Sequence, residues 1–270
     1  MGVYLLKYAW SVTKWKGFPE SEKEYEKNFE YAKSYSWVKE SGLAVEWWCF
    51  YEGFDKNYYW GWMLRPSAPI EDGSILFVIS KGPSQKSGLA VMQFVGVYGH
   101  YIKDEKTFNL RELLTEEQLG WLKKKAERNL KDVLKEISKC TYNFKSPKEL
   151  SFVLDKYIEV DQKKYFGTKL GQASYAKIGK KKYPKFIELL QKAKDENPNL
   201  SDKIDKIIEK LKSGEQGGSF GGNKNKYSLN QILSAISTKP FIIFAGISGT
   251  GKTQIARIIA SVMTKEKNKY

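Results

Sequence analysis

One segment, FIIFAGISGTGKTQIARIIA at residues 241–260, limits the possible folds of this chain more than any other stretch. Gly246, Gly251, Lys252 and Thr253 fit the pattern G-x-x-x-x-G-K-[ST]. The apolar letters FIIFA predict a strand before this pattern, and isoleucines at helical spacing predict a helix after it. A strand, a glycine-rich turn and a helix in this order are typical of an α/β phosphate-binding loop.

The residue types in this loop predict a nucleotide site with Mg²⁺. Glycines let backbone N–H groups turn inward around phosphate oxygens, and the N-terminus of the following helix adds partial positive charge. We expect Lys252 to reach the β- and γ-phosphates and Thr253 to be the metal ligand. The alternative is a glycine-rich turn without a ligand. The candidate nucleotide-binding residues are Gly246, Ser248, Gly249, Thr250, Gly251, Lys252 and Thr253.

Phosphoryl transfer needs more than this loop. An acidic residue at the end of a second strand must hold Mg²⁺, and an arginine must usually reach the transferred group. Only 17 residues follow Thr253, and they supply neither group. One strand and one helix also cannot bury their own apolar faces. We therefore expect a piece of a longer NTPase, cut just after the loop, that neither hydrolyses nucleotide nor binds it well.

The positive charge of the chain is unevenly spread. Residues 1–110 carry 13 Lys/Arg and 13 Asp/Glu, so the net charge of +15 lies entirely in residues 111–270. A basic segment favours a polyanionic partner, because neutralising phosphates releases counterions. The alternative is a lysine-coated, solvated helical surface.

Cysteine, histidine and hydropathy exclude several classes of protein. The chain has 2 cysteines and 1 histidine, which argues against a disulfide framework and a zinc site. No apolar run approaches the roughly 20 residues that cross a bilayer. We expect a soluble, cytoplasmic protein without a nuclease site, because no metal-binding carboxylate cluster is apparent.

The first 112 residues are rich in aromatic residues and alternate between helix and strand patterns. Ser21 and Glu24 form a capping-box pattern before a helix at 21–35. Short apolar runs punctuated by glycine and proline predict strands within 42–53, 58–66, 73–82 and 88–101. Short strands after a helix favour a small α+β barrel rather than a parallel sheet.

Residues 113–212 read as helical and basic. Thr115 and Gln118 form a second capping box, and apolar residues then recur at spacings of three and four as far as Ile137, which predicts one helix. Residues 184–194 and 201–213 predict a helical hairpin broken at 197–199. The intervening segment 161–184 reads as a loop rich in lysine, tyrosine and glycine, and 213–225 as a flexible glycine-rich linker.

Two stretches resemble known families. AGISGTGKTQIARIIA resembles the start of the AAA+ domain of McrB-like proteins, the NTPase motor subunits of modification-dependent restriction systems. The region from GSILFVISK to GLAVMQFVGVYG resembles an EVE or YTH-like domain of the PUA-like superfamily. A reader domain ahead of a motor is the order that this resemblance implies. The Walker B, sensor and GTP-signature regions of the family are missing from the sequence, so GTP and ATP stay open as the nucleotide.

The resemblance implies a domain organisation and a function. Residues 1–182 would be the PUA-like reader with a basic helical extension, 183–212 the helical hairpin, 213–226 the linker and 227–270 a truncated AAA+ segment. The reader would bind modified, typically methylated, DNA by flipping a base into an aromatic pocket. The whole protein would use NTP and Mg²⁺, assemble into a ring, and act with a nuclease subunit resembling McrC.

Candidate residues for these contacts lie mostly in the aromatic segment, because a flipped base needs flat π surfaces and a polar edge partner. Alternation on a strand predicts that Trp47 and Trp48 face opposite ways and that Trp60 and Trp62 face the same way. The alternative is that these rings fill a core. The pocket candidates are Trp47, Trp48, Tyr59, Trp60, Trp62, Asn57 and Gln93. The phosphate candidates are Arg65, Lys163, Lys164, Lys180, Lys181 and Lys182.

Two other functions fit the same sequence. A PUA-like module on an unrelated AAA+ ATPase would bind RNA instead of DNA. An AAA+ protein that remodels other proteins would use its first domain to bind a protein.

Overall fold

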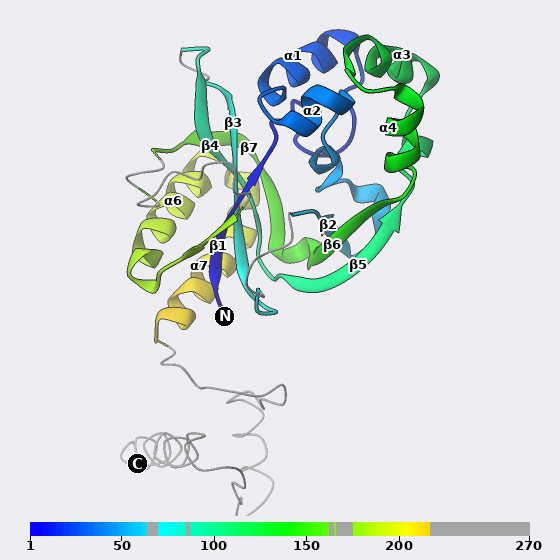
Figure 1. Ribbon diagram of the computed structural model, residues 1–270. Coiled ribbons are helices and arrows are strands. Elements are labelled where there is room, and N and C mark those ends of the chain that lie inside the picture. The colour runs from blue at the N-terminus through cyan, green and yellow to red at the C-terminus, as the bar shows by residue number, and fades with distance from the viewer. Residues whose placement is uncertain (64–69, 85–86, 162–164, 166–174, 217–270) are drawn as a thin grey trace, which may run out of the picture. The chain divides into compact units, whose positions relative to one another are not determined.

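A computed structural model describes residues 1–63, 70–84, 87–161, 165 and 175–216 (Figure 1). The chain divides into two compact units, Met1–Glu215 and Gln216–Tyr270. The described part is a mixed α+β fold with two sheets and several helices. The P-loop segment lies outside the described residues. Among the described helices, none has the length and hydrophobicity that a bilayer span requires.

The larger sheet has five strands, and most of its pairs are antiparallel. Its central strands β1 and β3 are the exception and run parallel, in a register that pairs Val3 with Ile75 and Tyr8 with Ser80. The strands lie in the order β7 (Ser151–Glu159), β4 (Ala90–Tyr98), β3 (Ile75–Pro83), β1 (Val3–Tyr8) and β8 (Tyr175–Ile178).

The smaller sheet is antiparallel and has three strands, in the order β2 (Tyr58–Gly61), β6 (Cys140–Pro147) and β5 (Ile102–Phe108). The backbone ladders between described strands stay within each of the two sheets. The described strands therefore form two separate sheets, and the closed barrel that the sequence predicts is not seen.

Six α-helices surround the sheets. They are α1 (Glu22–Ala32), α2 (Ser36–Ser41), α3 (Glu116–Lys125), α4 (Leu130–Ile137), α6 (Tyr183–Glu196) and α7 (Ser201–Gln216) in the described residues. Short 3₁₀ turns lie between the helices and strands: η1 (Val45–Trp48), η2 (Glu52–Phe54), η3 (Leu110–Leu113), η4 (Lys148–Leu150), η5 (Lys180–Lys182) and η6 (Pro198–Leu200).

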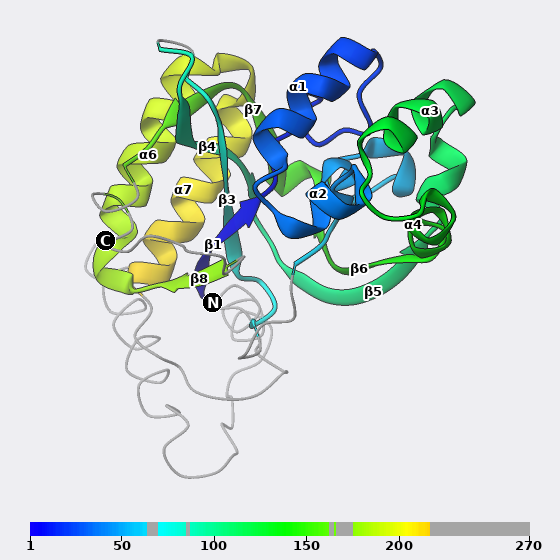
Figure 2. The same cartoon turned by 45° about the horizontal axis from the view of Figure 1, so that its top comes forward.

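The five-stranded sheet is buried on both faces, which explains its nearly continuous apolar strands. Along β1, Val3 and Leu5 point into a core shared with α6 and α7. The alternate residues Tyr4 and Leu6 point into a second core, which holds the aromatic residues of the first segment, α1 to α4 and the smaller sheet. The views agree that α6 and α7 cover one face of the sheet and the remaining elements the other (Figure 2).

Several sequence predictions are confirmed. Ser21 accepts a hydrogen bond from the backbone of Glu24 at the start of α1, and Thr115 and Gln118 form a complete capping box at α3. Strands β2 and β4 lie within the predicted segments, and β3 begins in its predicted segment and extends one residue past it, to Pro83. The hairpin of α6 and α7 is present, with its break at residues 197–200.

Three other predictions are wrong. The apolar run within 42–53 is not a strand, because Val45–Trp48 form the 3₁₀ turn η1. The predicted single helix ending at Ile137 is two helices, since Ala126 adopts extended backbone at the end of α3. Residues 113–212 are not wholly helical, because β6, β7 and β8 lie within them.

Candidate functional site

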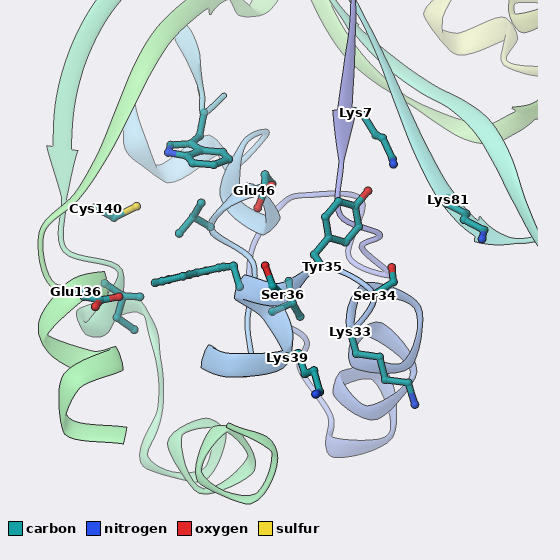
Figure 3. A pocket seen from close by; sticks show the side chains of 15 residues that line it. Lys7, Lys33, Ser34, Tyr35, Ser36, Lys39, Glu46, Lys81, Glu136 and Cys140 are labelled. Carbon is teal, nitrogen blue, oxygen red and sulfur yellow. The ribbon is translucent and has the colours of Figure 1, made fainter. Parts of the chain in front are cut away.

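A pocket of about 980 Å³ lies on the aromatic side of the larger sheet. It forms where the end of β1, helix α2, turn η1 and the junction of α4 with β6 come together. Its lining residues are Lys7, Lys33, Ser34, Tyr35, Ser36, Trp37, Val38, Lys39, Val45, Glu46, Trp62, Lys81, Glu136, Ile137 and Cys140 (Figure 3). This volume is within the range of pockets that enclose small organic ligands.

Trp37 provides one aromatic wall of the pocket. It lies in α2, which ends at Gly42 because that residue takes a left-handed conformation with φ of 81°. The guanidinium carbon of Arg128 lies 5.5 Å from the centre of the Trp37 ring, and Arg128 itself is held by both carboxylate oxygens of Glu136. The indole N–H of Trp37 is buried and has no hydrogen-bond partner among the described residues. Trp37 is therefore oriented by its stacking contact and keeps an unused donor.

Trp62 provides a second aromatic wall. It follows directly after β2, and the next residue is fixed by a side-chain amide: the Met63 N–H donates to Asn143 Oδ1 at 3.1 Å, and Asn143 Nδ2 donates to the Met63 carbonyl at 2.6 Å. Asn143 belongs to β6. The smaller sheet thus sets the position at which the Trp62 side chain reaches the pocket.

Glu46 is the acidic group at the buried end of the pocket. It lies in η1, whose 3₁₀ winding sends Val45, Glu46 and Trp47 in three different directions. In Figure 3, Glu46 lies between Cys140 on one side and Tyr35 on the other. Burial raises the pKa of the Glu46 carboxyl to about 7, and a hydrogen bond from its own backbone opposes this shift. No side chain in the described part of the chain donates a hydrogen bond to its carboxyl group.

Lysines line the outer part of the pocket. Lys33, Lys39 and Lys81 are exposed, so these three residues lie nearer to solvent than Glu46, which is half-buried, as Lys7 is. Lys33 pairs with Glu30 at 2.6 Å and Lys39 with Glu127 at 3.2 Å. Exposed pairs of this kind contribute little to stability, so these ammonium groups can exchange their carboxylate partner for another anion.

The two cysteines of the chain are both buried and both reduced. Cys140 lines the pocket, and burial raises the pKa of its thiol to about 12. Burial likewise raises the pKa of the Cys49 thiol. Among the described residues, no group of three or more His, Cys, Asp or Glu side chains is placed to hold a metal ion.

Trp62 is the one predicted pocket residue that lines this pocket, counting only described residues. Trp47 and Trp48 belong to the hydrophobic core instead, with exposures of 0% and 1%, and the Trp47 indole donates to the Trp10 carbonyl at 2.8 Å. Their assignment to an open pocket is therefore wrong. The reason is the 3₁₀ turn, which replaces the alternation of a strand.

The other pocket candidates lie elsewhere. Tyr59 and Trp60 are buried in the aromatic core, so Trp60 is separated from Trp62. Gln93 is buried, and its amide donates to the Pro83 carbonyl at 2.7 Å. Asn57 is exposed in a turn, where its N–H donates to Asp55. None of the four lines the described pocket.

The phosphate candidates are only partly described. Lys180, Lys181 and Lys182 form η5, which follows β8. Because Ile178 pairs with Val3, these lysines lie near the start of β1, about 13 Å along the strand from Lys7. Arg65, Lys163 and Lys164 lie outside the described residues, as do the nucleotide-binding candidates Gly246 to Thr253.

Sequence reasoning missed Trp37 and Glu46. A signal for Glu46 was present, because it is the one acidic residue inside the apolar run LAVEWWCF. An acid in such a run is costly to bury and therefore points to a role. Trp37 carries no comparable signal, since only the folded chain brings α2 and the end of β2 to one pocket.

No protein-family model, curated protein or solved structure matches this chain.

Proposed function

We propose that the described part of the chain binds DNA and holds a modified base, extruded from the duplex, between Trp37 and Trp62. The observation that carries this proposal is the composition of one pocket: two tryptophans, a carboxyl group at the buried end and four lysines at the outside. Aromatic faces suit the two sides of a base, the carboxyl group suits its polar edge, and the lysines suit the flanking phosphates.

The energies favour a damaged, modified or mismatched base. Extruding a base costs a few kcal/mol, whereas stacking on an aromatic side chain contributes about 1–3 kcal/mol per base. Stacking on two tryptophans therefore offsets the cost of extrusion. The polar contacts and any added methyl group then supply the preference for a modified base over an unmodified one. The lysines contribute attraction that does not depend on sequence.

The rest of the proposal extends the resemblance seen in the sequence. The described domain would be a PUA-like reader of the EVE or YTH type, and the P-loop segment would belong to a McrB-like AAA+ motor that uses ATP or GTP with Mg²⁺. A nuclease subunit resembling McrC would cut the DNA, and the motor would form a ring in the cytoplasm. Lys252 and Thr253 support this part, because they complete the phosphate-loop pattern.

A binding titration tests the reader function. The 270-residue chain is titrated with duplexes that differ only by N6-methyladenine, N4-methylcytosine or 5-methylcytosine, with the unmodified duplex and with RNA. A preference of about tenfold or more for one modified duplex is expected, since each specific base contact is worth about 1–3 kcal/mol. 2-Aminopurine placed beside the modified base should brighten when that base leaves the stack.

Two variants separate the pocket from general DNA attraction. Trp37→Leu and Trp62→Leu should remove the preference for modified DNA while leaving salt-dependent binding of unmodified DNA unchanged. Retention of the preference in both variants overturns the proposal. Stronger binding of RNA in the titration would favour the RNA-binding module, and binding of neither nucleic acid would favour the protein-remodelling alternative.

The outer lysines have their own test. Each phosphate contact contributes about 0.9 to the slope of log K against log salt concentration for duplex DNA. Lys39→Ala and Lys81→Ala should each lower the magnitude of this slope by about 1. Lys192→Ala is the matched control, because Lys192 is exposed on α6, which packs on the opposite face of the sheet. An equal change in the control would contradict a role for the pocket lysines.

A further inference from the structure

The chemistry of Glu46 goes beyond a general preference for modified bases. Glu46 is half-buried, and its carboxyl group receives a hydrogen bond from its own backbone but none from a side chain among the described residues. It shares the pocket with the apolar groups of Val45, Ile137 and Cys140. A carboxyl group that is partly withdrawn from water and still has acceptor capacity is stabilised by a ligand that donates a hydrogen bond to it. The site therefore favours a ligand that brings an N–H donor to its deep end.

The direction of entry decides which part of a base meets Glu46. In the proposed pose the sugar and phosphates stay outside, next to the exposed ammonium groups of Lys33, Lys39 and Lys81. The substituent farthest from the sugar then reaches the buried end. In cytosine and adenine this substituent is an amino group, whereas in thymine, uracil and hypoxanthine it is a carbonyl oxygen.

We propose that Glu46 is the specificity-determining residue of the pocket and accepts a hydrogen bond from the exocyclic amino group of an extruded cytosine or adenine. This inference rests on the proposed function. Carboxylate oxygens accept hydrogen bonds from such amino groups and repel a carbonyl oxygen. A single N-methyl group leaves one N–H on the amino nitrogen, so N4-methylcytosine and N6-methyladenine keep the contact.

The protonation state of Glu46 makes the preference depend on pH. An ionised carboxylate only accepts hydrogen bonds, whereas the neutral acid also donates one and tolerates a carbonyl oxygen. Because burial raises its pKa to about 7, Glu46 ionises near neutral pH, and the preference for amino bases should rise as the pH increases. The neighbouring titratable groups Tyr35, Cys49, Cys140 and Tyr142 have pKa values that burial raises further above neutrality. The remaining charged groups of the pocket are Lys7, Lys33, Lys39, Lys81 and Glu136.

Isosteric base pairs give the sharpest test. 5-Methylcytosine and thymine have nearly the same shape and differ in the amino or carbonyl group and in the adjacent ring nitrogen, which is an acceptor in the first and an N–H donor in the second. Adenine and hypoxanthine differ in the same way. Each base is placed opposite an abasic site, so that the cost of extrusion is similar for both members of a pair. Affinities of the 270-residue chain are measured at about pH 6 and about pH 8, on either side of the ionisation of Glu46.

The expected result is a ratio of affinities. The wild-type chain should bind the amino member about tenfold more tightly at about pH 8 and with a smaller ratio at about pH 6. Glu46→Gln should show a ratio near one at both pH values, because an amide can donate or accept. Glu46→Leu should also have a ratio near one, which would show that the difference in affinity comes from the carboxyl group.

Two failures can be told apart. If Trp37→Leu and Trp62→Leu abolish the base preference but the amino-to-carbonyl ratio is the same in wild type, Glu46→Gln and Glu46→Leu, then only the role of Glu46 is overturned. If the tryptophan variants leave base preference unchanged, the proposed function fails as well. Melting curves of each variant confirm that it is folded at the pH of the measurement.

Discussion

At the scale of single residues, Glu46 links the stability of the fold to its binding chemistry. The carboxyl group has a pKa of about 4.3 in an unfolded chain, and folding raises this pKa to about 7. The folded state therefore binds the proton more tightly than the unfolded state does. The resulting contribution to stability is fully present below the unfolded pKa and is lost as the pH rises through the folded pKa.

We predict that Glu46→Gln stabilises the protein at alkaline pH only. The amide cannot ionise, so the variant avoids the cost of a buried charge, which is on the order of 1–3 kcal/mol for a group that partly faces the pocket. Thermal melts at about pH 8.5 should show a higher Tm than wild type, with no gain at about pH 5. Glu188→Gln, at an exposed position on α6, is the control and should have equal effects at both pH values.

Arg128 is a positioning residue for Trp37. Its guanidinium group lies over the indole ring of Trp37 and is anchored by Glu136. Removing the guanidinium group therefore leaves the Trp37 ring without its stacking partner. A contact of this kind contributes about 0.5–1 kcal/mol at an exposed site, which corresponds to a loss of about two- to fivefold in affinity. Arg128→Ala should weaken binding of modified DNA by this factor in a titration. Arg111→Ala is the control, because Arg111 pairs with Glu116 and does not line the pocket; equal losses would contradict the stacking role.

At the scale of elements, α4 depends on the residue that caps its N-terminus. The side chain of Asn129 accepts a hydrogen bond from the Lys131 N–H at 2.9 Å, and the helix places Glu136 and Ile137 at the pocket. Losing such a cap costs about 1 kcal/mol. Asn129→Ala should therefore lower the urea midpoint, while Asn129→Asp keeps the cap and should leave it nearly unchanged. A similar loss in both variants would show that Asn129 acts in another way.

Comparison of the predicted and observed elements shows which sequence signals were sufficient to predict a helix or a strand. Strands β3 and β4 and the α6–α7 hairpin have clear periodicity and glycine or proline boundaries, so they were predictable. The run containing Glu46 is apolar on all sides, and such a run does not distinguish a strand from a buried turn. Strand β6 had the right signal, because Tyr142 and Phe144 are buried while Thr141 is exposed, but the lysine content of the region favoured a helical interpretation.

The break between α3 and α4 had no signal of its own. Apolar spacing continues from Leu122 through Leu130 to Val133, and no glycine or proline lies between the helices. The break is made by tertiary contacts, including the Arg128 N–H, which donates to the Glu40 carbonyl at 2.9 Å. The site was hidden for the same reason: Trp37, Glu46 and Trp62 lie on separate elements, and only packing brings them together.

At the scale of the whole molecule, the described unit has two cores that share one sheet. Alternate residues of β1 and β3 enter one core or the other, so neither core can be lost without exposing strands of the other. We expect the unit to unfold in one cooperative transition. The tryptophans offer a direct test, because all 8 of them lie in or against the aromatic core and none in the core of α6 and α7.

Leu190→Ala removes a fully buried side chain from the tryptophan-free core and should cost about 2–5 kcal/mol. If the unit unfolds in a single transition, the urea midpoints measured by tryptophan fluorescence and by far-ultraviolet circular dichroism should shift by the same amount. Glu188→Ala is the matched control, because Glu188 is exposed on the same helix. It should change neither the fluorescence midpoint nor the dichroism midpoint by much. A shift seen by dichroism alone would show that α6 and α7 unfold separately.

The buried thiols have a practical consequence for following the pocket in solution. Cys140 lines the pocket, but both thiols are buried and stay protonated, so maleimide reagents should modify them slowly in the native protein. A cysteine introduced at the exposed Lys81 should then be labelled selectively, without first replacing the natural ones. A fluorescent dye at that position would lie at the opening of the pocket and report ligand binding in real time. Because the two natural thiols react slowly, this chain can carry one dye at one chosen position.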